Sequence, residues 1–116
     1  MIHIETRSNI IYTTVSGTLD NAAVDQQFDV INRALEKHEK LRWYYEMNDF
    51  EGWNITSFFK DSLESMKRTA KFDKIAMVGD KKWQNLMAQV SKALTPAEVR
   101  FFDLDQKDEA KRWIEE

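Results

Sequence analysis

The chain opens with two short runs rich in β-branched residues, at residues 2–6 and 10–16. Isoleucine, valine and threonine are enriched in strands, and the two runs are separated only by Arg7, Ser8 and Asn9. The pattern predicts two antiparallel strands joined by a three-residue turn. The predicted sheet therefore begins with an antiparallel pair.

The next pattern, after Gly17, has the period of a helix. Apolar residues recur at steps of four, three and four, at Val24, Phe28, Ile31 and Leu35. Residues at this spacing share one face of an α-helix. We predict a helix that Asp20 caps at its start and that ends near His38.

Residues 41–47 have the period of a strand, because apolar side chains alternate there with other types. The alternating residues that we expect to face the core are Leu41, Trp43, Tyr45 and Met47. The intervening residues are Arg42, Tyr44 and Glu46. The strand is expected to stop at Asn48 and Asp49, which favour turns.

The second half of the chain continues this alternation of strands and helices. A continuous apolar run at residues 75–78 predicts a strand covered on both faces, and residues 99–102 predict the last strand. Helices are predicted at residues 55–70, from Trp83 to Leu94 before Thr95-Pro96, and after Asp103–Asp105, where the last helix buries Ala110, Trp113 and Ile114.

The predicted order of elements is β-β-α-β-α-β-α-β-α. Strands that alternate with helices imply right-handed crossovers and a mostly parallel sheet, here with an antiparallel N-terminal edge strand. A chain of 116 residues has the size of one domain. We therefore expect residues 1–116 to form a single α/β domain.

Composition narrows the classes of function. The net charge is -3, and the sequence has no long basic stripe that could bind the phosphate backbone of nucleic acid. Nucleic acid is therefore not an expected partner. The absence of cysteine excludes disulfides and cysteine-ligated metals. The N-terminal segment lacks the pattern of a signal peptide, and no apolar stretch approaches about 20 residues. We expect a cytoplasmic protein.

The turns from strand to helix in a parallel sheet lie at one edge, the carboxyl edge, where open α/β proteins bind ligands. The carboxylates that the pattern places there are Asp20, Asp49, Glu51, Asp80, Asp103 and Asp105. They could hold a divalent cation or act as acid and base, since carboxylate oxygens suit hard cations. Alternatively, Asp20, Asp80 and Asp105 cap the helices that follow them. Capping leaves Asp49 and Glu51 less fully explained.

The sequence contains no complete catalytic motif. The segment from Gly79 to Trp83 combines a glycine turn with a helix start, but it lacks the GxxxxGK[ST] spacing of a phosphate loop. His3 lies on the edge strand and His38 at a helix end, and we expect both to face away from the carboxyl edge. No serine is placed beside a histidine base. We therefore expect no enzyme activity.

Tryptophan and phenylalanine gather where two of the predicted helices begin. Trp53 and Trp83 start helices at the carboxyl edge, beside Phe50. Such aromatic residues line apolar pockets or partner surfaces, but they also fill cores. Both interpretations stay open at this point for Trp53 and Trp83.

Three stretches, "NDFEGW", "KIAMVGDKKW" and "AEVRFFDLDQKDEAKRWI", together resemble the SpoIIAA-like family of small bacterial proteins, in the STAS and CRAL-TRIO structural group. The resemblance covers nearly the whole chain and implies a β-first α/β domain. Anti-sigma factor antagonists among the relatives carry a phosphorylated serine in the turn that corresponds here to residues 49–53. This chain has no hydroxyl before Gly52 in that turn. CRAL-TRIO relatives instead enclose apolar ligands.

These observations favour a non-catalytic regulatory or protein-interaction domain that binds through the carboxyl edge of its sheet. The residues expected to form this surface are Asp49, Phe50, Glu51, Gly52, Trp53, Gly79, Asp80, Lys81, Trp83 and Asp103. The alternative is a binder of a small lipid-like or other apolar ligand, lined by Phe50, Trp53, Phe58 and Trp83. A third option is a carboxylate-metal hydrolase. Expected partners are an unidentified protein or a second copy of the chain, and no cofactor is expected.

Overall fold

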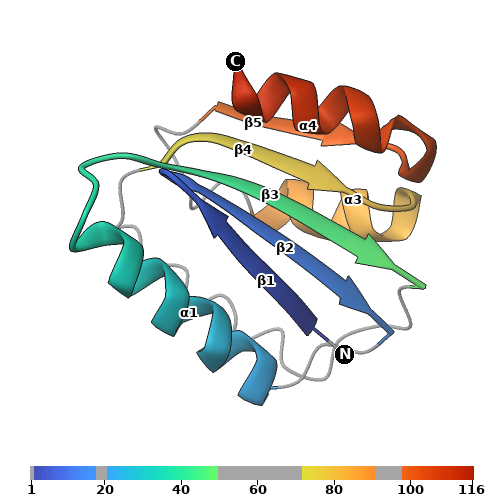
Figure 1. Ribbon diagram of the computed structural model, residues 1–116. Coiled ribbons are helices and arrows are strands. Elements are labelled where there is room, and N and C mark those ends of the chain that lie inside the picture. Colours follow the sequence, from blue (N-terminus) through green and yellow to red (C-terminus); the bar gives the residue numbers. More distant parts are fainter. Residues whose placement is uncertain (1, 18–20, 50–71, 91–97) are drawn as a thin grey trace.

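The computed structural model describes residues 2–17, 21–49, 72–90 and 98–116, and within them a five-stranded sheet (Figure 1). The strands are β1 (Ile2–Arg7), β2 (Ile10–Ser16), β3 (Leu41–Asn48), β4 (Phe72–Val78) and β5 (Glu98–Phe102). They lie in chain order, with β1 antiparallel to β2 and the other neighbours parallel. The predicted fold class, α/β with an antiparallel N-terminal edge strand, is confirmed.

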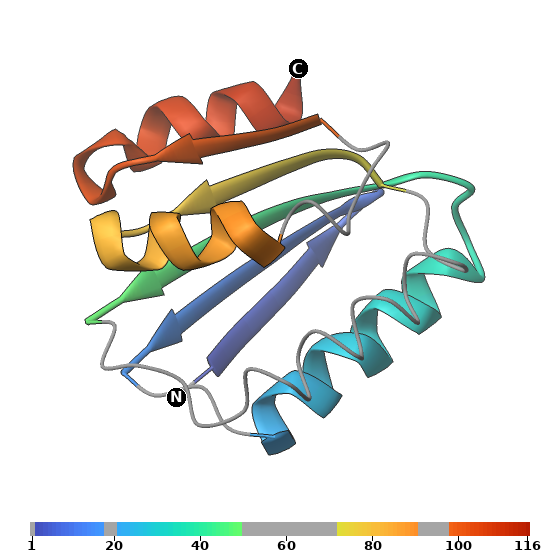
Figure 2. The ribbon, with the colours of Figure 1, turned by 180° about the vertical axis from the view of Figure 1, so that it is seen from behind.

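Helices cover both faces of the sheet. They are α1 (Asn21–Leu35), α3 (Lys81–Val90), the short 3₁₀ helix η2 (Leu104–Gln106) and α4 (Lys107–Glu115). In Figure 1, α3 lies behind the sheet and α4 in front of it, and Figure 2 shows α3 in front from the opposite side. The helix predicted at residues 55–70 and the end predicted at Thr95-Pro96 lie outside the described residues.

The turn between β1 and β2 is shorter than predicted. Arg7 pairs with Ile10 in the antiparallel ladder, so only Ser8 and Asn9 remain for the turn. Ser8 has a φ of 53°, in the left-handed region that tight turns use. The predicted three-residue turn is wrong because Arg7 continues the strand instead of leaving it.

The larger core lies between the sheet and helices α1 and α3. It contains Ile11, Val15, Ile31, Ala34, Leu41, Trp43, Tyr45, Met47, Phe72, Ile75, Met77 and Trp83. The Trp43 ring stacks on Phe72 with centroids 5.6 Å apart, and its Nε1 donates to Thr13 Oγ1 at 3.0 Å. Gln27 Nε2 donates to the Tyr45 hydroxyl at 3.1 Å. The buried polar groups of Trp43 and Tyr45 thus have partners, as low-dielectric interiors require.

A second core lies under α4. It contains Tyr44, Ala76, Val78, Phe102, Ala110, Trp113 and Ile114. The prediction that the last helix buries Ala110, Trp113 and Ile114 is confirmed. β3 and β4 are consequently covered on both faces. For β3 this differs from the predicted alternation, because Tyr44 and Glu46 are as buried as their neighbours.

Basic side chains hold the C-terminal end of α4 against the sheet. Arg42 of β3 donates to the Ile114 carbonyl at 3.0 Å, and Lys74 of β4 donates to the Trp113 carbonyl at 3.3 Å. Carbonyls in the last turn of a helix lack partners within the helix, so cations there supply both hydrogen bonds and charge. This contact fixes α4 across the two central strands.

Candidate functional site

The carboxyl ends of β2 to β5 meet at one edge of the sheet, as predicted. Backbone hydrogen bonds join neighbouring strand ends there, from Gly17 N to Asn48 O at 3.0 Å and from Gly79 N to Phe102 O at 3.1 Å. We call the described residues at this edge the carboxyl rim: Gly17, Asn48, Asp49, Gly79, Asp80, Lys81 and Asp103. Of the predicted surface, Phe50, Glu51, Gly52 and Trp53 lie outside the described residues, as do Asp20 and Phe58.

Asp49 begins the turn that follows β3. It is exposed and has a φ of 50°, a left-handed conformation that aspartate tolerates better than most residues do. The strand ends at Asn48, directly before this residue. The predicted stop at Asn48 and Asp49 is therefore confirmed, and the left-handed backbone conformation of Asp49 gives a structural reason for its residue type.

Asp80 caps α3. Its Oδ1 accepts a hydrogen bond from the backbone N–H of Trp83 at 2.9 Å, and its carbonyl accepts from Gln84 N at 2.9 Å. A side-chain oxygen three residues before an unpaired amide is the usual N-cap arrangement. The capping interpretation of Asp80 is confirmed. Lys81 and Lys82, which follow it, are exposed on the first turn of the helix.

Trp83 belongs to the core rather than to the rim surface. Its side chain is fully buried, and its ring lies 5.2 Å from that of Tyr45. Of the two interpretations left open for Trp83, the structure supports the core, and the prediction that Trp83 forms part of the rim surface is wrong. Trp83 is the third residue of α3, which begins at Lys81, and its side chain lies on the face of the helix toward the sheet.

Gly79 leaves the space that the Trp83 ring occupies. A Cβ atom added at Gly79 would lie 2.6 Å from Cγ of Trp83 and nearer still to Cδ1. Carbon atoms pack at about 3.5–4.0 Å, so this position has no room for a side chain. The glycine of the "VGD" turn is thus required by close packing.

Gln84 joins three parts of the rim, and no motif in the sequence singles it out. Its Nε2 lies 2.9 Å from the Gly79 carbonyl, 2.8 Å from Asp103 Oδ1 and 3.3 Å from the Phe102 carbonyl. These contacts tie the ends of β4 and β5 to the first turn of α3. The only available signal was a polar residue four positions after the capping Asp80, on the same helix face.

Asp103 begins the turn after β5. Its backbone N–H donates to Gln106 Oε1 at 3.0 Å, and its carbonyl accepts from Gln106 N at 2.9 Å. Asp103 therefore occupies the N-cap position of η2, whereas Asp105 lies inside this short helix. The predicted cap at Asp105 is wrong because a 3₁₀ turn precedes α4 and moves the helix start two residues earlier.

A buried carboxylate, Glu46, lies near the rim on the α4 side of the sheet. The Tyr44 hydroxyl donates to its Oε1 at 2.7 Å, and Asn48 Nδ2 donates to its Oε2 at 2.6 Å. Lys107 Nζ lies 3.2 Å from the same Oε2. This cluster was not predicted, because the alternation along β3 placed Glu46 on the outer face, which α4 covers in the structure.

Opposing effects set the charge state of Glu46. Burial raises the pKa of its carboxyl, but hydrogen bonds from Asn48, Tyr44 and Lys107 favour the ionised form and leave the pKa below its usual value of 4.5. Burial and the hydrogen bond to Glu46 raise the pKa of Tyr44, which keeps its proton. Glu46 is therefore an ionised carboxylate engaged in holding β3 and α4 together.

Replacing Glu46 with glutamine is expected to lower the free energy of unfolding by about 1–3 kcal/mol at neutral pH, the range for losing hydrogen bonds to a buried charge. The folded state favours ionised Glu46, so this stabilisation is present above the unfolded pKa, near 4.5, and is lost as pH falls through the lower folded pKa. Urea titrations of wild type and variant at several pH values measure the difference. The difference in the free energy of unfolding between wild type and the Glu46 variant should shrink below pH 4.5. The control Glu36→Gln, at an exposed position on the other side of the sheet, should unfold with the same free energy as wild type. A pH-independent difference would contradict the prediction.

The two histidines differ in how far they lie from the rim. His38 lies beyond the end of α1, at the opposite edge of the sheet, as predicted. His3 was also expected to face away from the rim, but it pairs with Thr14 near the rim end of β2, because β1 runs antiparallel. Its exposed ring lies 3.4 Å from Glu5 Oε1.

Among the residues in the four described ranges, no three histidine or carboxylate side chains gather in a way that could hold a metal ion.

Comparison with known proteins gives a consistent family. A family model described as SpoIIAA-like matches residues 10–115. No curated protein matches the sequence. In the part of the chain that the structure describes, no helix has the length and apolar character needed to cross a membrane.

One matching solved structure is that of an uncharacterised protein from the DUF3478 family of Shewanella loihica PV-4, which has a SpoIIAA-like fold. It is 21% identical in sequence and has a TM-score of 0.67. The match covers 98% of this chain and 92% of that chain. At this identity, the similarity is one of fold. Because the family model spans nearly all of the sequence, the chain belongs to the SpoIIAA-like family.

Proposed function

We propose that this domain is a non-catalytic regulatory or interaction module that binds a protein partner through its carboxyl rim. The observation that carries the proposal is that the carboxylates at or near this edge form hydrogen bonds within the domain. Glu46, Asp80 and Asp103 are each engaged in structural hydrogen bonds. Carboxylates that are held in this way stabilise a surface instead of exchanging protons with a substrate.

The rim also presents charge on a rigid frame, which suits recognition. Asp49, Asp80 and Asp103 are exposed together with Lys81 and Lys82. Backbone hydrogen bonds and Gln84 fix the strand ends beneath these residues. Charged groups on a preorganised surface select partners and steer their approach, while ordering few side chains on binding. A partner surface with alternating positive and negative groups would match this pattern.

The experiment compares partner capture by wild type with capture by a rim variant, Asp49→Asn with Lys81→Glu. Both side chains are exposed, and asparagine tolerates the positive φ at position 49, so the variant should fold. We expect partners recovered by wild type to be reduced about tenfold or more, as the loss of charged contacts worth 1.4 kcal/mol or more would produce. Quantitative mass spectrometry after affinity capture measures the change.

The matched control is Asp29→Asn with Lys40→Glu. It introduces the same change in net charge on exposed residues of α1 and of the α1–β3 loop, away from the rim. Sedimentation of each variant separates self-association from capture of a different protein. Identical partner recovery by the wild type and the rim variant would show that the rim is not the binding surface.

A further inference from the structure

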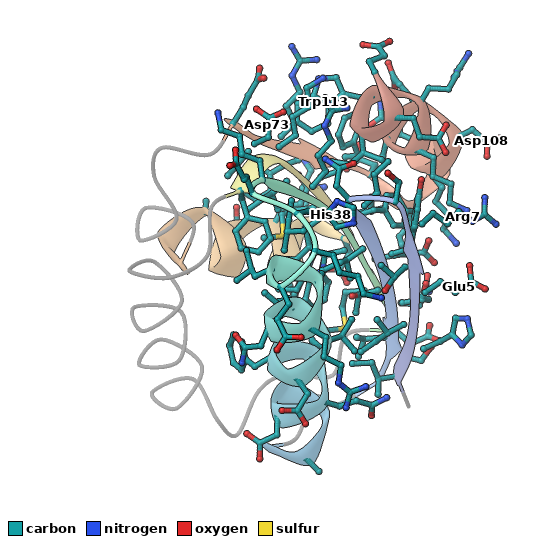
Figure 3. All side chains as sticks on the ribbon, turned by 60° about the vertical axis from the view of Figure 1, so that its left-hand side comes forward. Glu5, Arg7, His38, Asp73, Asp108 and Trp113 are labelled. Carbon is teal, nitrogen blue, oxygen red and sulfur yellow. The ribbon has the colours of Figure 1, made fainter. Side chains whose placement is uncertain are left out.

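A cavity of about 470 Å³ lies at the edge of the sheet opposite the carboxyl rim. It is formed between the β1–β2 turn and the C-terminal part of α1. The lining residues are Thr6, Ser8, Val30, Arg33, Ala34, Lys37 and His38. Figure 3 shows His38 at the end of α1, whereas Glu5 and Arg7 point from β1 away from α1. The proposed rim surface and this cavity are therefore separate sites.

The two walls of the cavity are held in place by hydrogen bonds. Asn9, in the β1–β2 turn, accepts a hydrogen bond from Arg42 N at 2.8 Å and donates its side-chain amide to the Lys40 carbonyl at 3.2 Å. At the other wall, the Lys37 and His38 amides both donate to the Ala34 carbonyl, at 3.1 and 3.0 Å. The turn is thus fixed to the start of β3, and Ala34 anchors the end of α1 because it belongs to the core between this helix and the sheet, so the cavity is preformed.

Every described ionisable residue that lines the cavity is basic. Arg33 and Lys37 are four residues apart, on one face of α1 and its terminal turn, and His38 follows them. Thr6 and Ser8 bring hydroxyl groups from the opposite wall. Within the described ranges, Arg33 and Lys37 have no carboxylate within ion-pair distance and no side-chain hydrogen bond.

The helix dipole explains only part of this arrangement. Cations near the last turn of a helix are stabilising by about 0.3–1 kcal/mol, which would favour Arg33 and Lys37 at the end of α1 on any exposed surface. The dipole does not require a preformed cavity or hydroxyl groups across from the cations. Concave walls with donors on both sides, and with no acid among the described lining residues, are instead suited to holding an anion.

From this geometry we propose that the cavity binds a phosphate ester. The guanidinium of Arg33 can donate two parallel hydrogen bonds to phosphate oxygens, and Lys37 adds a compact positive charge. The hydroxyls of Thr6 and Ser8 supply further donors to the same group. The cavity exceeds the volume of a phosphate, and Val30 and buried Ala34 form an apolar part where an organic substituent packs. A soluble ester and a phospholipid headgroup both have this chemistry.

The test uses phenyl phosphate in solution and, separately, vesicles of phosphatidylcholine that contain phosphatidic acid. Binding of phenyl phosphate should shift amide resonances of Ser8, Lys37 and His38 in a two-dimensional NMR titration. The variant Arg33→Gln with Lys37→Gln should bind about tenfold or more weakly, since each lost charge-assisted hydrogen bond contributes more than 1.4 kcal/mol. Both side chains are exposed, so the variant should keep the wild-type melting temperature.

The control variant, Lys81→Gln with Lys82→Gln, removes the same charge from the carboxyl rim and should bind phenyl phosphate as wild type does. Phenyl phosphate binding without vesicle binding would identify a soluble ester as the ligand class. Vesicle binding that the Arg33 and Lys37 variant loses would identify a lipid headgroup. The proposal is overturned if neither probe binds, or if the control variant loses binding as strongly as the cavity variant. Neither result depends on a protein partner at the rim.

Discussion

Replacing Trp83 with alanine is expected to lower the free energy of unfolding by about 3–5 kcal/mol, the range for truncating a buried tryptophan. The side chain is fully buried between α3 and the sheet, and its ring contacts Tyr45. Removing it leaves a cavity that the surrounding side chains can fill only in part. Urea-induced unfolding followed by circular dichroism measures the change.

The neighbouring substitution Lys82→Ala provides the control for Trp83→Ala. It lies one residue away on the same helix turn, but its side chain is exposed, so its effect should stay within about 0.5 kcal/mol. Equal effects of the two substitutions would show that Trp83 does not carry the packing of α3. The expected loss of stability also means that altered binding by a Trp83 variant would report unfolding rather than contact with a partner.

Replacing Gly79 with alanine is expected to lower the free energy of unfolding by about 1–3 kcal/mol, the range for overpacking a core. The added methyl group would overlap the Trp83 ring. Relief requires Gly79 to move, yet its N–H is bonded to Phe102 and its carbonyl to Gln84. The strain should therefore spread to the ends of β4 and β5, which a chemical denaturation curve and amide exchange at these strands would detect.

A double-mutant cycle isolates this contact. In a Trp83→Ala background the ring is absent, so adding Gly79→Ala should cost less than it does in wild type. The coupling energy is expected in the range of about 0.5–3 kcal/mol that contacting residues show. Strictly additive effects of the two substitutions would mean that Gly79 is required for a reason other than the space occupied by Trp83.

The dependence of Gly79 on Trp83 shows how the rim is built on the core. Asp80 is exposed at this turn, whereas Gly79, directly before it, and Trp83, which the turn positions, are buried. Gln84, next to Trp83 in the chain, returns to the surface to bind Asp103. The polar surface of the carboxyl rim therefore depends on the packing of Trp83, which the same turn places in the core.

Sequence patterns were sufficient for most of the fold. The apolar residues at every second position of β3, the continuous apolar run in β4 and the helical spacing that leads to Leu35 located these elements, because each reflects local geometry with a fixed period. The burial of the intervening residues of β3 did not follow from its period. The antiparallel pairing of β1 with β2 followed from the short connection between these two strands. Errors occurred where one residue could join either of two local structures, as at Arg7, or where a 3₁₀ turn preceded a helix, as at Asp105.

The candidate site was only partly predictable. Because parallel strands end at a common edge, Asp49, Asp80 and Asp103 could be placed together from the order of elements. Gln84 and Glu46 could not, because their roles depend on which distant atoms the folded chain brings near them. Glu46 is buried by Lys107 and α4, more than fifty residues further along the chain. The direction in which Trp83 points likewise depends on how α3 packs.

The sequence by itself determined the α/β class, the antiparallel edge strand, the common edge for the strand ends and the absence of thiol chemistry. These properties follow from hydrophobic period, connection length and composition, which are local or additive along the chain. Tertiary structure alone decided that Trp83 is buried and that Glu46 is an ionised carboxylate that binds Lys107 of α4. It also decided that Arg33, Lys37 and His38 line one cavity with Thr6 and Ser8. Burial, pKa and cavity shape depend on contacts between residues far apart in sequence, and no local period encodes those contacts.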